Sequence, residues 1–243
     1  MSRGTASPVV LHAVAHVGEF TAAAAERGGL ERFVSAADHA SAQRHAAPAD
    51  GARALAARAL ARLLSARVLG LAPIRAAGLA SHADACRSCG GAHGKPGLEG
   101  VVVNWSRSGS WVMAAAAPPA AGPLGVDIER IPANLFDGFD AHCLSPAERS
   151  ALAPPDVEGR MRLWVAKEAL LKACGYGLAI PPAAVRTSPL PSVDPLTADG
   201  ADTRALDGLS VHQVSAPRGY AAAASCRRQL QLVAVSPHQL FSA

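Results

Sequence analysis

Residues 100–129 read GVVVNWSRSGSWVMAAAAPPAAGPLGVDIE, and this stretch determines how the chain is organised. Two strand-like runs, Gly100–Asn104 and Trp111–Ala117, flank a polar turn at Ser106–Gly109, which predicts a β-hairpin. Residues 117–123 are rich in Pro and Gly and predict a linker. A third strand-like run, Leu124–Glu129, follows. A hairpin, a linker and a new strand divide the chain into two parts, and its length allows one large unit or two small ones.

Helices and further strands are predicted on both sides of this linker. Before it, Val9–Val17 predicts a strand, residues 20–46 a weakly patterned helical region, and the leucine stripe of residues 55–66 a helix that Asp50 could cap. After it, the closing strand candidates are residues 209–214, 219–226 and 230–235. Each half thus combines helices with short strands, which favours an α+β fold over a parallel βαβ array.

Two helices of the second half carry clear end signals. Ser145 can supply the N-cap oxygen, with Pro in the first helical position and Glu148 to close a capping box. Met161–Cys174 predicts a second helix, which ends where Gly175 can adopt the left-handed conformation.

Composition excludes several classes of function. The 243 residues carry a net charge of +4, which suits an anionic ligand or an acidic partner. No Lys/Arg run is interleaved with aromatic residues, so we expect no nucleic-acid binding. No apolar stretch is long enough to predict a membrane span. The five cysteines are an odd, scattered set, so we expect a reducing compartment, the cytoplasm.

The motif Gly125-Val126-Asp127-Ile128-Glu129 has the alternation of a half-buried strand. Val126 and Ile128 can enter the core while Asp127 and Glu129 share the other face. Two neighbouring carboxylates repel each other unless a cation lies between them, and hard oxygen ligands suit Mg²⁺. A solvated edge strand with two unrelated acids would give the same pentapeptide.

The motif Trp164-Val165-Ala166-Lys167-Glu168-Ala169-Leu170-Leu171-Lys172 places Glu168 and Lys172 on one helical face. Taken alone, this spacing is typical of a surface ion pair, and it also fits a third carboxylate for the metal beside an ammonium for a phosphate. Ser106, Arg107 and their neighbours in the predicted turn could cradle a phosphate, or form an ordinary polar turn.

These segments together resemble the Sfp-type 4'-phosphopantetheinyl transferase superfamily, in its bacterial, actinobacterial-like form. The paired signature is Gly-Val-Asp-Ile-Glu followed by Trp-x-x-Lys-Glu-Ala-x-x-Lys. Further similarities are His93-Gly94-Lys95-Pro96, the segment Asp50–Arg53 that leads into a helix, and Gly175–Leu178. The resemblance implies two similar α+β halves related by a pseudo-twofold axis, residues 1–117 and 118–243. Coenzyme A would bind in the cleft between them.

The resemblance also implies a function and a set of site residues. The enzyme would move the phosphopantetheine arm of coenzyme A to a serine of an acyl- or peptidyl-carrier protein, with Mg²⁺ as cofactor. Asp127, Glu129 and Glu168 match the metal ligands, and Asp127, Glu168 and Lys172 the catalytic residues. Positions that match the coenzyme A contacts are Arg53, Lys95, Pro96, Ser106, Arg107 and Lys172. Two fused halves imply a monomer.

The chain departs from the family pattern at two places. Arg107 stands where the family usually has a histidine; arginine can hold a phosphate in bidentate fashion but cannot shuttle a proton near neutral pH. The lysines that some members use in the N-terminal helix are absent around Ser41, and Arg44 or Arg53 could replace them. A carrier-protein patch is expected around Leu135, Phe136 and Arg149, although both apolar residues also suit a core.

Two alternative functions remain open at this point. His82, Cys86, Cys89 and His93 have the ligand types of a structural zinc site, or they belong to a loop with two free thiols. The three acidic residues would also suit another Mg²⁺-dependent phosphoryl-transfer enzyme or a hydrolase. The sequence does not indicate which pathway the carrier protein serves, or whether acyl-coenzyme A donors are accepted.

Overall fold

A computed structural model describes residues 8–85, 90–91, 94–177, 180–185, 187, 206 and 208–242. The first of its sheets has four strands in the order β4-β5-β1-β9. They are β1 (Val9–His16), β4 (Val102–Ser108), β5 (Trp111–Ala117) and β9 (Gln231–Ala234). β1 is antiparallel to β5 and parallel to β9. The C-terminal part of the chain therefore returns to the sheet of the N-terminal part.

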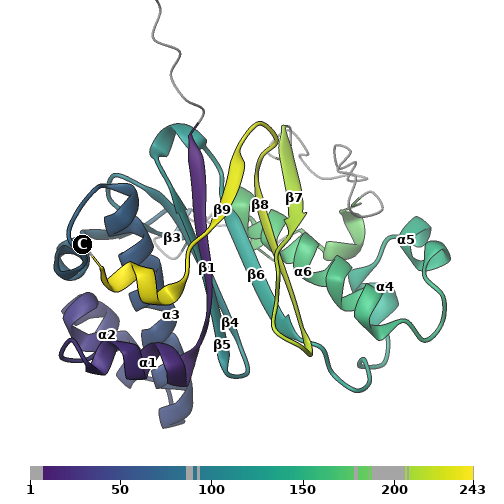
Figure 1. The fold of residues 1–243 in the computed structure, drawn as a ribbon. Coiled ribbons are helices and arrows are strands. Elements are labelled where there is room, and N and C mark those ends of the chain that lie inside the picture. Colours follow the sequence, from purple (N-terminus) through teal and green to yellow (C-terminus); the bar gives the residue numbers. More distant parts are fainter. Residues whose placement is uncertain are drawn as a thin grey trace, which may run out of the picture.

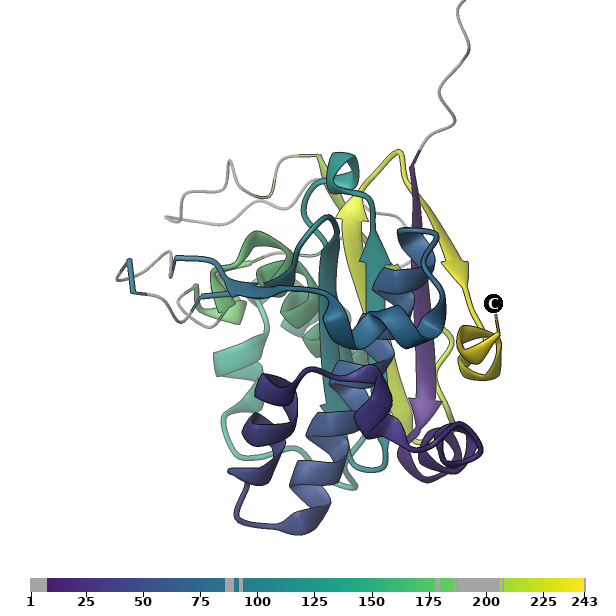
Figure 2. The same ribbon diagram turned by 90° about the vertical axis from the view of Figure 1, so that its left-hand side faces the viewer.

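Helices cover one face of this first sheet, as Figure 2 shows from the helical side. They are α1 (Val17–Ala25), α2 (Ala36–Gln43) and α3 (Pro48–Val68), with the 3₁₀ turns η1 (Leu30–Phe33), η2 (Pro73–Gly78) and η7 (Pro237–Phe241). The leucine stripe of α3, including Leu60, Leu63 and Leu64, is buried in the core cluster that α3 shares with the sheet. The short strands β2 (Ser81–Ala83) and β3 (Pro96–Leu98) form a separate two-stranded sheet.

The start of α3 differs from the prediction. Ala47 is the N-cap residue and Pro48 begins the helix, whereas Asp50 lies inside the first turn and pairs with Arg53. Proline is favoured in the first helical turn because its missing N–H has no partner there in any case. The prediction that Asp50 caps this helix was wrong for that reason.

The second sheet has three antiparallel strands in the order β6-β8-β7. They are β6 (Gly125–Arg130), β7 (Leu209–Gln213) and β8 (Tyr220–Arg227), and the helices beside them are α4 (Phe139–Cys143), α5 (Pro146–Ala151) and α6 (Val157–Cys174), with the 3₁₀ turns η3 (Pro119–Ala121) and η5 (Pro182–Ala184). Both predicted helix signals are confirmed: Ser145 and Glu148 form the capping box of α5, and Gly175 ends α6 with φ 74°.

The two sheets pack against each other through an apolar layer that includes Val10, Met113, Val126 and Ile128. Figure 1 shows the strands in the middle of the molecule, with α1–α3 on one side and α4–α6 on the other. Mixed helix and sheet content confirms the α+β class. Two similar halves, the pseudo-twofold axis and the boundary between residues 117 and 118 stay predictions.

One part of the hairpin prediction was wrong. Ser106, Arg107 and Ser108 belong to strand β4, and the turn lies at Gly109 and Ser110. The register pairs Ser106 with Met113 and Ser108 with Trp111. Small polar residues resemble a turn, but here the edge strand uses them to contact a neighbouring strand of the other sheet.

Ser225 on β8 offers a test of how a buried, unpaired hydroxyl affects stability. Its side chain is fully buried, and its hydroxyl oxygen has no hydrogen-bond partner in the described part of the chain. A buried unpaired hydroxyl costs about 1–3 kcal/mol, so Ser225→Ala should leave the free energy of unfolding in urea unchanged or raise it. The matched control is Ser210→Ala on β7, because the Ser210 hydroxyl donates to the Cys226 carbonyl at 3.2 Å. If both variants lost the same unfolding free energy, the Ser225 hydroxyl could not be unpaired as described.

Candidate active site

The candidate site lies where the edge strands β4 and β6 of the two sheets meet, beneath helix α6. On β6, Val126 and Ile128 belong to the apolar layer between the sheets. Asp127 and Glu129 pair across the sheet with Ala223 and Ala221, which pack in the core cluster of α6. The predicted alternation of β6 is therefore confirmed, and it turns both carboxylates toward α6 and β4.

Asp127 is the most enclosed of the three predicted metal ligands, with 1% of its surface exposed. Its Oδ1 accepts hydrogen bonds from Lys172 Nζ at 2.6 Å and from Ser106 Oγ at 2.7 Å. Its Oδ2 is buried and has no hydrogen-bond partner among the described residues. One oxygen of this carboxylate is thus satisfied by an ammonium and a hydroxyl, while the other remains available to a ligand.

Glu168 stands on α6, one turn before Lys172, as the spacing predicted. Burial raises the pKa of Glu168, the nearby charges of Asp127 and Glu129 raise it further, and Lys172 opposes both effects. Its Oε1 is buried and, within the described ranges, has no hydrogen-bond partner. Glu168 therefore interacts electrostatically with both carboxylates of β6 in a setting that disfavours its charge.

Glu129 is the third carboxylate of the group, and it is half-buried at the end of β6. Its Oε2 accepts a hydrogen bond from Ser108 Oγ at 2.6 Å. Burial raises the pKa of Glu129, a shift that Ser108 and Lys172 oppose and Asp127 reinforces. The site thus combines Asp127 and two carboxylates with raised pKa values, those of Glu129 and Glu168, with the ammonium of Lys172.

The donor chemistry of this site fits a hard divalent cation. Carboxylate oxygens are the preferred ligands of Mg²⁺, and Asp127 and Glu168 each have one buried oxygen without a hydrogen-bond partner in the described part of the chain. In the part of the chain that is described, however, no three His, Cys, Asp or Glu side chains are grouped closely enough to hold a metal ion. In this arrangement the cation in contact with Asp127 is the Lys172 ammonium.

The predicted coenzyme A residues of the first half are spread over several elements. Arg53 pairs with Asp50 on α3, and Lys95 donates to the Leu124 carbonyl oxygen beside β6. Arg107 is exposed on β4. The Ser106 hydroxyl contacts Asp127, so it faces the carboxylates.

A small pocket of about 210 Å³ lies between α3 and β3. Pro96 lines it, as do Arg58, Arg62 and Trp105, which were not predicted. Arg62 is buried and satisfied by Asp38 and by backbone carbonyls of residues 76–79. Arg58 lies 3.2 Å from Asp38, the nearest acid.

The surroundings of Arg58 carry an excess of positive charge. Burial lowers the pKa of Arg58, and repulsion from Arg107, Arg44 and Arg62 lowers it further against the attraction of Asp38. The i, i+4 spacing of Arg58 and Arg62 was visible in the sequence, but in a chain with so many arginines it did not single them out.

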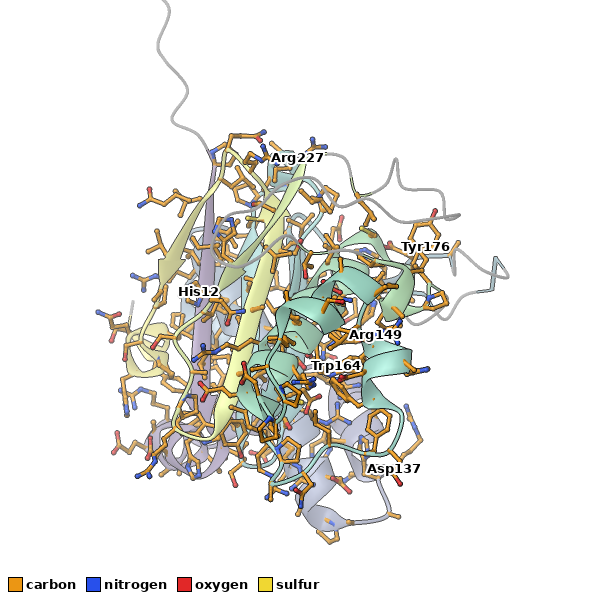
Figure 3. All side chains as sticks on the ribbon, turned by 90° about the vertical axis from the view of Figure 1, so that its right-hand side faces the viewer. His12, Asp137, Arg149, Trp164, Tyr176 and Arg227 are labelled. Atoms are coloured by element: carbon orange, nitrogen blue, oxygen red, sulfur yellow. The ribbon has the colours of Figure 1, made fainter. Side chains whose placement is uncertain are left out.

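The other predicted sites are described only in part. Cys86, Cys89 and His93 of the zinc alternative lie outside the described residues, as does Leu178, whereas His82 is exposed on β2. Phe136 of the expected carrier patch is 59% exposed and packs its ring edge on Phe139. Figure 3 shows Arg149 and Trp164 on the same side of the molecule, over α5 and α6.

Comparisons with known proteins bear on the second half of the chain. A search of curated proteins finds no match. Among the described residues, every helix is too short or too polar to cross a membrane. Residues 123–225 match the model of the 4'-phosphopantetheinyl transferase superfamily, and this segment contains β6, α6 and all three carboxylates. The similarity to the 4'-phosphopantetheinyl transferase superfamily thus covers the segment that carries the candidate site.

Proposed function

We propose that the protein is an Sfp-type, Mg²⁺-dependent transferase that moves 4'-phosphopantetheine from coenzyme A to a serine of an acyl- or peptidyl-carrier protein. The observation that carries this proposal is the arrangement of Asp127, Glu129, Glu168 and Lys172. These side chains come from one strand and one helix inside the segment that matches the family model, and two of their buried carboxylate oxygens have no hydrogen-bond partner among the described residues. Phosphoryl transfer needs such positioning and charge neutralisation more than covalent help from the protein.

In the proposed reaction, the serine hydroxyl of the carrier attacks the β-phosphate of coenzyme A. A new oxygen–phosphorus bond forms, the bond to the nucleotide breaks, and 3',5'-ADP leaves. Asp127, Glu129 and Glu168 would hold Mg²⁺, which when bound neutralises charge on the pyrophosphate. Glu168 takes the serine proton, since its raised pKa makes it a better base than an ordinary carboxylate.

Lys172 has a separate role in this mechanism. Its ammonium lies 2.6 Å from Asp127 and is 28% exposed, so it can reach both the carboxylates and a ligand beside them. We propose that it neutralises the negative charge that develops on the leaving nucleotide phosphate. In the absence of substrate, its contact with Asp127 offsets part of the repulsion within the acidic group.

The nucleotide part of coenzyme A is proposed to bind on the first half. The pocket beside Trp105 and Pro96 offers an aromatic ring for a base, and the excess of arginine charge around Arg58 and Arg107 suits a phosphate. Lys95 is adjacent to this pocket in sequence. Arg53 and Ser106 are also proposed to contact coenzyme A, and this proposal rests only on the match of their positions to the family pattern.

The carrier protein is proposed to dock near Phe136. Its exposed ring and the exposed residue Arg149 lie in the half that holds the carboxylates, and an acidic partner would complement the net positive charge of the chain. Because each half would supply one wall of the coenzyme A cleft, we further propose that the enzyme acts as a monomer.

Mass spectrometry of a carrier protein tests the proposed function. An apo carrier incubated with the enzyme, coenzyme A and Mg²⁺ should gain the mass of one phosphopantetheine. Asp127→Ala should abolish that gain because it removes both a metal ligand and the partner of Lys172. Glu158→Ala, an exposed carboxylate at the start of the same helix that carries Glu168, is the control and should keep wild-type transfer.

Two results would contradict the proposal. Breakdown of coenzyme A without any mass gain on the carrier would favour the alternative hydrolase function. Near wild-type transfer by a folded Asp127→Ala protein, with folding checked by circular dichroism, would remove Asp127 from the metal site.

A further inference from the structure

Strand β4 directs three alternate side chains at strand β6, although the two strands belong to different sheets. The Asn104 side-chain oxygen accepts from Val126 N at 2.8 Å, and Ser106 Oγ donates to Asp127 at 2.7 Å. Ser108 Oγ accepts from Arg130 N at 3.0 Å and donates to Glu129 Oε2 at 2.6 Å. We call Asn104, Ser106 and Ser108 the β4 ladder. It carries hydrogen bonds from the first sheet to the strand that bears both carboxylates.

We propose that Ser108 is a positioning residue that orients the Glu129 carboxylate for a divalent cation, so that the first half completes the acidic site of the second. The inference rests on the proposed function. Ser108 lies outside residues 123–225, the segment that matches the superfamily.

The geometry of Ser108 explains how one hydroxyl can orient a carboxylate. A serine hydroxyl has one proton, and because its oxygen already accepts from the Arg130 backbone, that proton is left for Glu129. The two bonds join Ser108 to neighbouring residues of β6, so the Arg130 N–H fixes the hydroxyl to the strand and the hydroxyl in turn fixes the Glu129 carboxylate. A glutamate side chain has several rotatable bonds, and this contact limits the conformations it samples.

Repulsion within the site makes such a contact necessary. Asp127 disfavours the charge of Glu129, and a half-buried glutamate at a strand end can turn away from a like charge toward solvent. The bond from Ser108 opposes that movement. Hydrogen bonds to ligating carboxylates commonly change metal affinity or activity by about 10- to 100-fold when they are removed.

Removal of the Ser108 hydroxyl should affect the metal more than the fold. The hydrogen bond from the Arg130 N–H to Ser108 Oγ is exposed to solvent. In the Ser108→Ala variant, water can therefore accept from this N–H in place of the lost hydroxyl oxygen. Ser110→Ala is the matched control, because Ser110 belongs to the same hairpin and its side chain is exposed.

Mn²⁺ titration of the full chain, followed by electron paramagnetic resonance with and without coenzyme A, tests the proposal. Ser108→Ala should bind Mn²⁺ about tenfold more weakly than wild type, while Ser110→Ala should bind as wild type does. In transfer assays, Ser108→Ala should raise the Mg²⁺ concentration for half-maximal rate and keep kcat at saturating Mg²⁺. A structural defect would instead lower the melting temperature or kcat.

A double-mutant cycle separates positioning of Glu129 from any general effect. In a Glu129→Gln background, the Ser108→Ala change should cause no further loss of Mn²⁺ affinity, because its partner is already altered. Equal Mn²⁺ affinity in wild type and Ser108→Ala, or additive losses in the cycle, would overturn the positioning role and leave the proposed function intact. A wild-type protein that binds no Mn²⁺ in either condition would overturn both.

Discussion

The Gly125→Ala variant is expected to lose about 3 kcal/mol of unfolding free energy, the upper part of the usual range for overpacking, and with it most transfer activity. A Cβ atom at position 125 would lie 2.0 Å from the Ala169 carbonyl oxygen and 2.4 Å from Ala173 N. Both atoms belong to the backbone of α6, so no side chain can rotate away. The helix would have to move off β6, and Glu168 and Lys172 would move with it.

Urea unfolding and the carrier-protein assay measure the two expected losses. Gly78→Ala is the control, because a Cβ atom there meets nothing within 4 Å. It should change neither stability nor transfer. If Gly125→Ala were as stable and active as wild type, the close packing of α6 on β6 would be wrong, and the placement of Glu168 would lose its support.

The elements with local signals could be predicted from the sequence. The capping box of Ser145 and Glu148 and the left-handed Gly175 depend on neighbours a few residues away, and both appear as predicted. The alternation of Asp127 and Glu129 likewise depends only on the two-residue period of a strand. These features define β6 and α6, which is why the carboxylates of the candidate site could be identified from the sequence.

Features that depend on distant contacts could not be predicted in this way. Nothing local indicates that Gln231–Ala234 pairs in parallel with β1. The small polar residues Ser106 and Ser108 indicated a turn, because their use as donors to β6 depends on the packing of two sheets. Arg58 could not be singled out from the sequence, because the positive charge around it comes from other arginines that the fold brings near it.

In the motif Trp164–Lys172, the structural residue Lys167 stands next to the proposed catalytic residue Glu168. Its fully buried ammonium donates to Glu148 at 2.6 Å and to the carbonyl oxygens of Cys143 and Pro182. Glu148 also accepts from Thr187 Oγ1 at 2.6 Å, so the buried charges are paired and hydrogen-bonded. This network joins α5, α6 and the segment after α6. The capping glutamate of α5 thus also anchors the helix that presents Glu168.

The Glu168→Gln variant is expected to be about 10³-fold slower in transfer, within the range for loss of a general base, and yet more stable than wild type near neutral pH. The amide keeps the size of the side chain and cannot accept the serine proton. It also removes a charge that burial and two neighbouring carboxylates disfavour in the folded state. Activity and stability should therefore change in opposite directions.

The pH dependence of this stability difference follows from the raised pKa of Glu168. In the unfolded chain the carboxyl titrates near its ordinary value of 4.5, whereas the folded state keeps its proton to higher pH. As pH rises from the unfolded to the folded pKa, wild type loses stability, because the folded state binds more protons in that window. Melting temperatures of Glu168→Gln and wild type should diverge as pH rises through it, with the exposed Glu158→Gln variant as control. A Glu168→Gln protein less stable than wild type at neutral pH would mean that contacts of the charged form, such as the attraction of Lys172, outweigh its burial.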